Sequence, residues 1–387
     1  MNKITIPTTF IVSDRIRDIM YEKIAYRFNS LQKLSSNKRN KEITLTLKDN
    51  VSKKELKEII NTINKELSSL SKIERFSKKR SYSQTIDLDE STYNKVKSIM
   101  DEYISVIPRI NDYRTYNNED GLRSVSGDLQ KFKSWLNSLI SDIFYELFSP
   151  TQINVPDLIS TCSVKRSGYF NTSSQMMYFV GEVNKDTSSF DKYINLTNIG
   201  SFDDAFKTLK NANMVLNPAV CLQLYPLIEK KIMDSSKITT FDLIGKAFRD
   251  EGGKFNFHDR LREFEVHEIV FFGTPKQLQK LYPFVVSVTQ MLFNKLNIPI
   301  ESSFSNDIFF GPQNDKYLFS QMISDDKLEF TTLHSNISLA SINKHKSKFT
   351  DEYSITADNS EKIHSFCLAF GIDRILSVYK EMFKEKL

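Results

Sequence analysis

The feature that most constrains this chain is the stretch at residues 247–273, which reads AFRDEGGKFNFHDRLREFEVHEIVFFG. It predicts two extended segments joined by a polar, glycine-containing turn, with charged residues at alternate positions among apolar ones. Alternation along a strand places Phe248 on one face and both Arg249 and Glu251 on the other. A buried arginine and glutamate are costly unless they contact each other or a ligand. The pattern therefore suits a hairpin whose charged residues bind a polar ligand or each other.

A nucleoside triphosphate suits this hairpin. A guanidinium binds a phosphate or carboxylate with two hydrogen bonds, a carboxylate accepts from a base amino group, and an aromatic ring covers the base. The alternative is a surface hairpin whose charged side chains form solvated salt bridges. Short motifs match by chance, so the spacing alone leaves both interpretations open.

Composition sets the broad class of the protein. The chain has 387 residues, with 40% hydrophobic and 26% charged residues, as in soluble globular proteins of two or three domains. No apolar run approaches the ~20 residues that span a bilayer, and the N-terminal residues lack the pattern of an export signal. Three cysteines make no disulfide framework. We therefore expect a cytoplasmic protein with no membrane partner.

The first quarter of the chain is rich in lysine and arginine, although the net charge is only +5. A basic region of this kind can follow a nucleic-acid backbone. It can also be a solvated helix face, and the interleaved Glu55, Glu58 and Glu66 favour that simpler interpretation.

Periodicity predicts an α+β N-terminal domain. Apolar residues at helical spacing lie within residues 16–28, and residues 42–48 alternate as a short strand. Ser52 is a good N-cap, Glu55 would complete a capping box, and the helix that follows buries one apolar face.

Further along, a helix is expected at residues 91–107 and a linker at residues 108–127. A strongly periodic helix then covers residues 129–148, and residues 153–159 are extended. We therefore divide the chain into an accessory domain at residues 1–120 and a larger domain at residues 121–387.

The larger domain resembles a known family. Arg249-x-Glu251, a loop, then Arg260, Phe264 and Glu268 are similar to motif 2 of class II aminoacyl-tRNA synthetases. The similarity is greatest to archaeal-type seryl-tRNA synthetases and to amino acid:carrier protein ligases. Other segments agree in order along the chain: residues 128–156 resemble motif 1, residues 161–170 and 216–226 resemble the segments between the motifs, and CLAFGIDR at residues 367–374 resembles motif 3.

This resemblance covers roughly residues 125–387 and implies the fold. We expect an α+β protein with a mostly antiparallel sheet flanked by helices, after a small N-terminal α+β domain. Motif 1 forms the dimer interface in the family, so the resemblance also implies a homodimer built partly on residues 129–159.

The resemblance implies a zinc site as well. Spacing alone favours buried structural thiols, because the chain has no CxxC or HxxxH pair. In the family, a cysteine, the last glutamate of motif 2 and a cysteine of motif 3 bind Zn²⁺, and these match Cys162, Glu268 and Cys367. The open fourth position would take the amino group of the substrate. Cys221 has no such match and is expected in the core.

By resemblance, motif 2 and motif 3 would also bind ATP. Arg249 would bridge the amino acid carboxylate and the α-phosphate, and Glu251 would accept from the adenine amino group. Phe264 and Arg374 would stack on the two faces of adenine. Arg260 would reach the outer phosphates.

The chain departs from the family pattern at several positions. Alanine stands at 369 where glycine is usual, and Asp373 replaces glutamate. Before SINKH at residues 341–345, which includes Asn343, we expect an acidic Mg²⁺ ligand. Residues 334–336 are His-Ser-Asn there, so Glu329 is the nearest upstream carboxylate.

Three functions remain open. The first is ATP-dependent activation of a small amino acid and its transfer to the phosphopantetheine thiol of a carrier protein. The second is an archaeal-type seryl-tRNA synthetase, whose acceptor is tRNA. The third is a non-catalytic binding paralogue, which the departures in motif 3 and at the magnesium site would allow.

Overall fold

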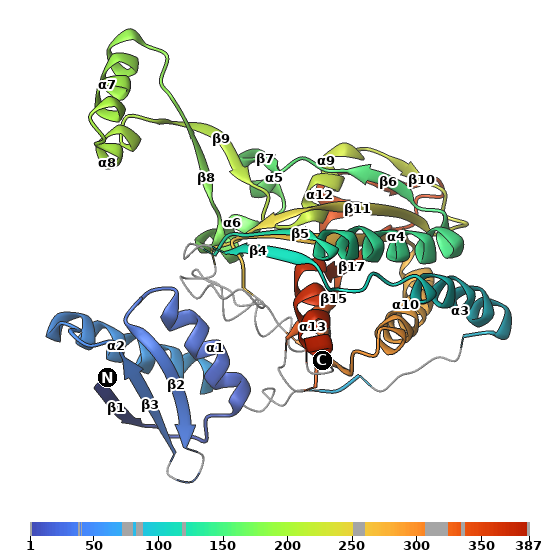
Figure 1. The fold of residues 1–387 in the computed structure, drawn as a ribbon, viewed down its shortest axis with the longest axis horizontal. Coiled ribbons are helices and arrows are strands. Elements are labelled where there is room, and N and C mark those ends of the chain that lie inside the picture. The colour runs from blue at the N-terminus through green and yellow to red at the C-terminus, as the bar shows by residue number, and fades with distance from the viewer. Residues whose placement is uncertain are drawn as a thin grey trace.

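The structure is a computed structural model, and it describes residues 2–37, 39, 41–71, 80–82, 88–117, 121–250, 260–305, 324–333 and 337–384. Figure 1 shows a small N-terminal unit beside a larger body that contains the central sheet.

The N-terminal unit is an antiparallel sheet covered by two helices. The strands are β1 (Asn2–Pro7), β2 (Leu31–Asn37) and β3 (Glu42–Leu47), in the order β1-β3-β2, and the helices are α1 (Asp14–Ala25) and α2 (Lys53–Leu70). Its buried side chains form a hydrophobic cluster of their own, drawn only from residues 6–70. The α+β architecture expected for this region is therefore present.

Local sequence determines how α2 begins. Ser52 is the N-cap, and its side chain accepts from the backbone N of Glu55 at 3.1 Å. The predicted capping box is wrong in its second half, because Glu55 Oε1 accepts instead from Ser30 Oγ at 2.6 Å. A buried ion pair, Lys23 Nζ to Glu66 Oε2 at 2.8 Å, joins α1 to α2.

Hydrophobic packing divides the chain nearer residue 70 than residue 120. Helix α3 (Glu90–Ser105) buries Val96 and Met100 in the core of the larger body, against α4 (Asp128–Phe148). The linker expected at residues 108–127 contains a hairpin instead, formed by β4 (Tyr113–Asn117) and β5 (Arg123–Gly127). At the junction of β5 and α4, a Cβ on Gly127 would lie 2.3 Å from the Asp112 carbonyl oxygen, so this turn requires glycine.

The larger body is built on a seven-stranded sheet in the order β13-β14-β15-β17-β12-β11-β6. All neighbouring strands are antiparallel except β6 and β11, which are parallel. The strands are β6 (Thr151–Asn154), β11 (Thr239–Phe248), β12 (Glu263–Gly273), β13 (Ile300–Phe304), β14 (Lys327–Thr332), β15 (Ser338–Lys346) and β17 (His364–Gly371).

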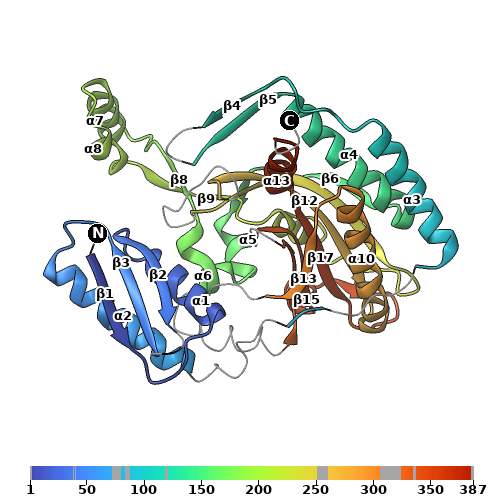
Figure 2. The same ribbon diagram turned by 60° about the horizontal axis from the view of Figure 1, so that its bottom comes forward.

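Long helices cover one face of this sheet, called the back face here. These helices are α3, α4, α10 (Pro275–Lys295) and α13 (Ile372–Lys384), whose positions Figures 1 and 2 show. Their side chains bury the large core against the sheet. The opposite, front face packs against shorter elements: η3 (Val220–Gln223), α9 (Leu224–Leu227) and α12 (Lys348–Glu352).

Smaller elements complete the body. They are β7 (Leu158–Ser160), α5 (Thr161–Arg166), α6 (Tyr169–Ser173), η2 (Ser174–Met176), β10 (Ile232–Met233) and β16 (Thr356–Ala357). A parallel pair joins β10 to β16.

An arm projects from this body in Figure 1. Strands β8 (Phe179–Glu182) and β9 (Lys210–Leu216) carry α7 (Thr187–Asn198) and α8 (Phe202–Phe206) at its tip. Five apolar side chains there are exposed: Phe190, Ile194, Ile199, Phe202 and Phe206. The tip therefore keeps aromatic surface outside the hydrophobic cores.

The predicted fold class is confirmed, because the structure has a mostly antiparallel sheet flanked by helices. The helix and strand expected at residues 128–156 are α4 and β6. Within the described residues, no helix has the length and apolar character needed to cross a bilayer.

Candidate active site

Strand register brings the predicted site residues onto the front face of the sheet. Along one row, Glu268 of β12 pairs with Ala369 of β17, Ala369 with Ser341 of β15, and Ser341 with Glu329 of β14. In the next row, Cys367 pairs with Asn343. Side chains two residues apart on a strand share a face, so residues distant in sequence meet here.

Arg249 and Phe264 lie together at the ends of β11 and β12. The guanidinium carbon of Arg249 is 5.4 Å from the centre of the Phe264 ring, and its Nε donates to the Pro218 carbonyl oxygen at 2.8 Å. The segment before η3 therefore orients Arg249 from one side. A guanidinium over an aromatic ring at this distance is a favourable cation–π geometry.

Motif 3 places Arg374 in the first turn of α13. Its Nη1 donates to the Ser338 carbonyl oxygen at 3.1 Å, which ties α13 to the start of β15. Glu251, the other residue predicted to contact adenine, lies outside the described residues.

Arg260 contacts the N-terminal unit. Its Nη2 is 2.9 Å from Glu22 Oε1 on α1, and both side chains are mostly buried. The arginine predicted to bind the outer phosphates therefore already contacts a carboxylate from another part of the chain.

A sulfur-rich cluster lies deeper on the front face. The ligand atoms of Cys221, His345 and Cys367 all lie within 4.8 Å of one another. His345 Nε2 is 3.7 Å from Cys367 Sγ, while its Nδ1 is 2.7 Å from the Tyr225 hydroxyl. Asn343 Nδ2 is 3.9 Å from the same sulfur. Both thiols are buried.

Glu268 belongs to this cluster. Its side chain contacts Cys221, and within the described part of the chain its Oε2 is buried without a hydrogen-bond partner. Burial, and then the negative charge of Cys367, raise the pKa of Glu268 to about 8. A hydrogen bond from the Cys221 thiol lowers the pKa of Cys367 well below its usual value. Two sulfurs and an unsatisfied carboxylate fit the donor set of Zn²⁺.

Cys162 does not join this cluster, so the predicted metal set needs a correction. It lies on α5 with an exposed side chain, whereas Cys221 is buried beside Cys367 and Glu268. Sequence order does not reveal which cysteine folds over the sheet. Cys221 ends the segment at residues 216–221, and Pro218 of that segment contacts Arg249, a contact that residue spacing does not show.

The residues predicted for magnesium lie on the same face. Glu329 Oε1 is 3.0 Å from Lys327 Nζ, and Asn343 Nδ2 donates to Ser341 Oγ at 3.2 Å. Residues 334–336 lie outside the described residues. Glu329 is thus on the front face, with β15 and β17 between it and Glu268, and a cation lies beside it.

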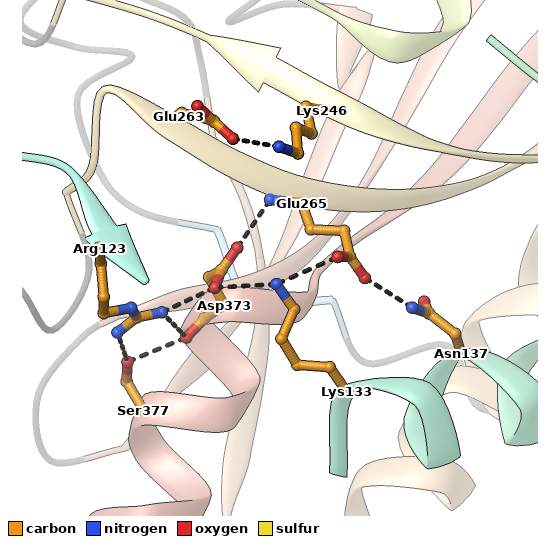
Figure 3. A network of polar contacts seen from close by, with 8 residues as sticks. All are labelled: Arg123, Lys133, Asn137, Lys246, Glu263, Glu265, Asp373 and Ser377. Atoms are coloured by element: carbon orange, nitrogen blue, oxygen red, sulfur yellow. Dashed lines mark hydrogen bonds and ion pairs between the residues drawn. The ribbon is translucent and has the colours of Figure 1, made fainter. Parts of the chain in front are cut away.

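Asp373 anchors a buried polar network behind the site (Figure 3). Its Oδ1 is 2.8 Å from Arg123 Nη2 and 3.3 Å from Lys133 Nζ, and its Oδ2 accepts from the backbone N of Glu265 at 2.7 Å. Lys133 Nζ is also 3.0 Å from Glu265 Oε2. The network ties β5, α4, β12 and α13 together next to Phe264 and Arg374.

Burial by itself raises the pKa of Asp373, but the charges of Lys133 and Arg123 outweigh it and lower that pKa below its ordinary value. The network continues along α4, where Asn137 Nδ2 donates to Glu265 Oε1 at 2.6 Å. Sequence reasoning missed this feature. The signal was the polar spacing of Lys133, Asn137 and Ser141 on a helix whose other residues are largely apolar.

Comparison with known proteins agrees with this geometry. Residues 205–383 match the family model described as tRNA synthetase class II core domain (G, H, P, S and T). Residues 205–383 therefore match a class II tRNA synthetase core domain, and the resemblance drawn from the motifs is confirmed.

Two kinds of curated ligase are similar to this chain. Amino acid--[acyl-carrier-protein] ligase 1 of Bradyrhizobium diazoefficiens is 26% identical over 234 residues, which cover 58% of this chain and 68% of that protein. Type-2 serine--tRNA ligase of Methanopyrus kandleri is 23% identical over 248 residues, which cover 57% of this chain and 45% of that protein. The chain thus spans about two thirds of the first relative and under half of the second.

A solved structure shares the fold. The M. kandleri SerRS, crystallised in complex with A. aeolicus tRNASec, superposes with a TM-score of 0.56 at 14% identity, covering 97% of this chain and 73% of that chain. At this identity the similarity concerns the fold.

Proposed function

We propose that this protein is an ATP-dependent ligase that joins a small amino acid to the phosphopantetheine thiol of a carrier protein. In the first step, a carboxylate oxygen of the amino acid attacks the α-phosphorus of ATP, and pyrophosphate leaves. In the second step, the acceptor sulfur attacks the carbonyl carbon of the adenylate, loses its proton, and AMP leaves. The observation that carries this proposal is the placement of Arg249, Phe264, Glu268 and Cys367 on one face of the sheet.

The side chains have distinct roles in this proposal. Arg249 bridges the substrate carboxylate and the α-phosphate, where negative charge develops in the transition state. Phe264 and Arg374 cover the adenine, and Glu251 accepts from its amino group. Arg260 binds the outer phosphates. These groups act through alignment and charge.

Two cations are part of the proposal. Cys221, Glu268 and Cys367 would hold Zn²⁺, and His345, which contacts Cys367, would support that ligand from outside. When bound, the zinc supplies a Lewis-acid position for the free amine of the amino acid. Glu329 is the carboxylate proposed for Mg²⁺. The residues themselves orient the carboxylate of the amino acid towards Arg249.

The carrier protein is favoured as acceptor by the N-terminal unit and by sequence identity. That unit contains helices of 12 and 18 residues in a compact α+β fold, without long paired helices in the described residues. The carrier protein ligase is 26% identical to this chain over the matched region, and the tRNA ligase is 23% identical. tRNA remains the alternative acceptor, supported by the basic first quarter of the chain.

A test of the first step is amino acid-dependent exchange of labelled pyrophosphate into ATP, with serine, glycine and alanine as substrates. The proposal predicts exchange with at least one of them. Absence of exchange with all three, in zinc-loaded protein, would instead favour a non-catalytic paralogue. Transfer assays with tRNA and with a phosphopantetheinylated carrier protein then separate the two acceptors.

We also infer a homodimer that uses α4 and the neighbouring strands. Exposed apolar side chains on these elements support it: Tyr145 of α4 is 60% exposed and Ile244 of β11 is 36% exposed. Light scattering during size-exclusion chromatography tests it, and a monomeric mass at micromolar concentration would contradict it.

The contact between Glu22 and Arg260 leads to a prediction about ATP. A phosphate must compete with the Glu22 carboxylate for the guanidinium, so Glu22→Gln should lower the KM for ATP by roughly 3- to 10-fold with kcat little changed. The exposed Glu58, changed to Gln, is the control on the same unit and should have no effect. An unchanged or higher KM in Glu22→Gln would mean that this contact does not oppose ATP binding.

The aromatic tip of the arm leads to a prediction about the acceptor. Phe202 and Phe206 are 55% and 59% exposed and lie 6.5 Å apart between ring centres, a surface suited to docking a macromolecule. The double change to Ser should reduce aminoacyl transfer by about 10-fold while leaving pyrophosphate exchange intact. Tyr116→Ser, an exposed aromatic elsewhere, is the control. Equal losses in both assays would point to damaged folding.

A further inference from the structure

A cavity of about 730 Å³ lies on the back face of the sheet, away from the thiols and Glu268. Helix α10 and the ends of β15 and β17 form its walls, and residues 81 and 82 close one side. These two residues follow the N-terminal unit and pair with β13, because the backbone N of Tyr82 donates to the Ser302 carbonyl oxygen at 2.9 Å. The volume of the cavity is within the range of small-molecule sites.

The cavity is distinct from the adenylate site because side chains alternate along β15. Asn343 and His345 point to the front face, where both contact Cys367. Lys344, between them, points to the back face, where its Nζ lies 4.0 Å from the centre of the Tyr282 ring on α10.

Charge in this cavity is unbalanced at Lys344. Two carboxylates lie nearby, but each already contacts another cation: Asp325 pairs with Arg80, and Asp326 is 2.8 Å from Lys346 Nζ. Among the described residues, Lys344 Nζ forms no ion pair or hydrogen bond, and it makes a cation–π contact with the Tyr282 ring. The charges of Asp325 and Asp326 act on Lys344 from nearby, but its direct contact is the aromatic ring, so this half-buried ammonium is incompletely compensated. An anion that enters the cavity would complete the charge compensation of Lys344.

The other walls are aromatic. Tyr82 lies edge-on to Tyr282 and to Phe304, with ring centres 5.9 and 5.7 Å apart. Within the described residues, the hydroxyls of Tyr82 and Tyr282 are buried without hydrogen-bond partners. Such groups are usually paired in folded proteins, so a ligand that reaches them after small side-chain movements would gain hydrogen bonds.

We propose that this cavity is a second ligand site, which binds a small organic anion with its carboxylate or phosphate on Lys344 and its apolar body among Tyr82, Tyr282 and Phe304. The site is independent of the proposed ligase activity, because it uses the other face of the sheet. Since residues 80–82 connect the N-terminal unit to the body, a bound anion would contact that connection directly.

The test uses full-length protein with phenyl phosphate and phenylacetate as probes, measured by saturation-transfer NMR and calorimetry. These probes distinguish a phosphate ester from a carboxylate. At least one should bind with a stoichiometry of one and a dissociation constant in the millimolar range or below. Excess ATP and Mg²⁺ should not displace it. Failure of both probes to bind, or displacement by ATP, would overturn the proposal.

Variants locate the binding site. Lys344→Met should weaken probe binding by about 10-fold or more, and Lys344→Arg, which keeps the charge, should retain binding within about 3-fold. Gln279→Trp, at an exposed position of α10 that lines the cavity, should also weaken binding without altering the core. Lys231→Met, a cation near Phe241 elsewhere in the body, is the control. Undiminished binding in both Lys344→Met and Gln279→Trp would refute the site.

Discussion

Replacing Cys221, Glu268 or Cys367 is expected to remove bound zinc and to lower amino acid-dependent pyrophosphate exchange by roughly 10²- to 10³-fold. The physical reason is that each side chain belongs to one buried donor cluster, and loss of one donor leaves too few to retain the ion. The variants are Cys221→Ala, Glu268→Gln and Cys367→Ala. Metal content by mass spectrometry and exchange activity are measured on the same samples.

The matched control is Cys162→Ala. Its thiol is exposed on α5, so zinc content and activity should both equal those of the unchanged protein. Loss of zinc in Cys162→Ala, with zinc retained in Cys221→Ala, would reverse the correction made from the structure. Near-UV circular dichroism of each variant separates loss of the ion from loss of the fold.

His345 needs a variant of its own. One of its ring nitrogens contacts Cys367 Sγ and the other contacts the Tyr225 hydroxyl, which would orient the ring. His345→Gln should therefore weaken zinc binding by about 10- to 100-fold if the histidine supports the ligands from outside. Complete loss of the ion would make His345 a ligand itself.

Asp373→Asn is expected to lower the free energy of unfolding by about 3–5 kcal/mol. It removes the negative charge that Arg123 and Lys133 share, while both cations stay buried and the shape of the side chain is kept. Urea unfolding monitored by fluorescence of Trp135 gives the comparison. Lys207→Met is the control, because its ion pair with Asp204 is exposed to solvent and its loss should leave the free energy of unfolding nearly unchanged.

The loss of unfolding free energy in Asp373→Asn should depend on pH in a defined direction. The pKa of Asp373 is lowered in the folded protein, so its charge stabilises the fold fully above the unfolded-state pKa of about 4. That contribution disappears as pH falls through the lowered, folded-state pKa. The difference between Asp373→Asn and the unchanged protein should therefore be largest near neutral pH and shrink in acid. A difference that grows in acid would contradict the role assigned to this carboxylate.

Much of the fold was predictable because it depends on local patterns. The spacing of apolar residues predicted the helices at α2, α3 and α4, and Ser52 marked the start of α2. The hairpin β4–β5 was missed because a polar segment with glycines reads as a linker when its partner strand is short. The boundary expected at residue 120 differs from the observed packing because α3 packs with the body through Val96 and Met100. Periodicity predicts the helix but cannot assign that contact.

By itself, the sequence determined the family and the fold class, since motifs 2 and 3 and the long helix α4 depend on residue types at fixed local spacing. Tertiary structure alone decided which cysteine accompanies Glu268 and Cys367, and that Glu22 contacts Arg260. It also decided that Lys344 faces a cavity behind the sheet, opposite its two neighbours. Those contacts join segments tens to hundreds of residues apart, and strand register and chain crossing bring them together, which local spacing does not encode.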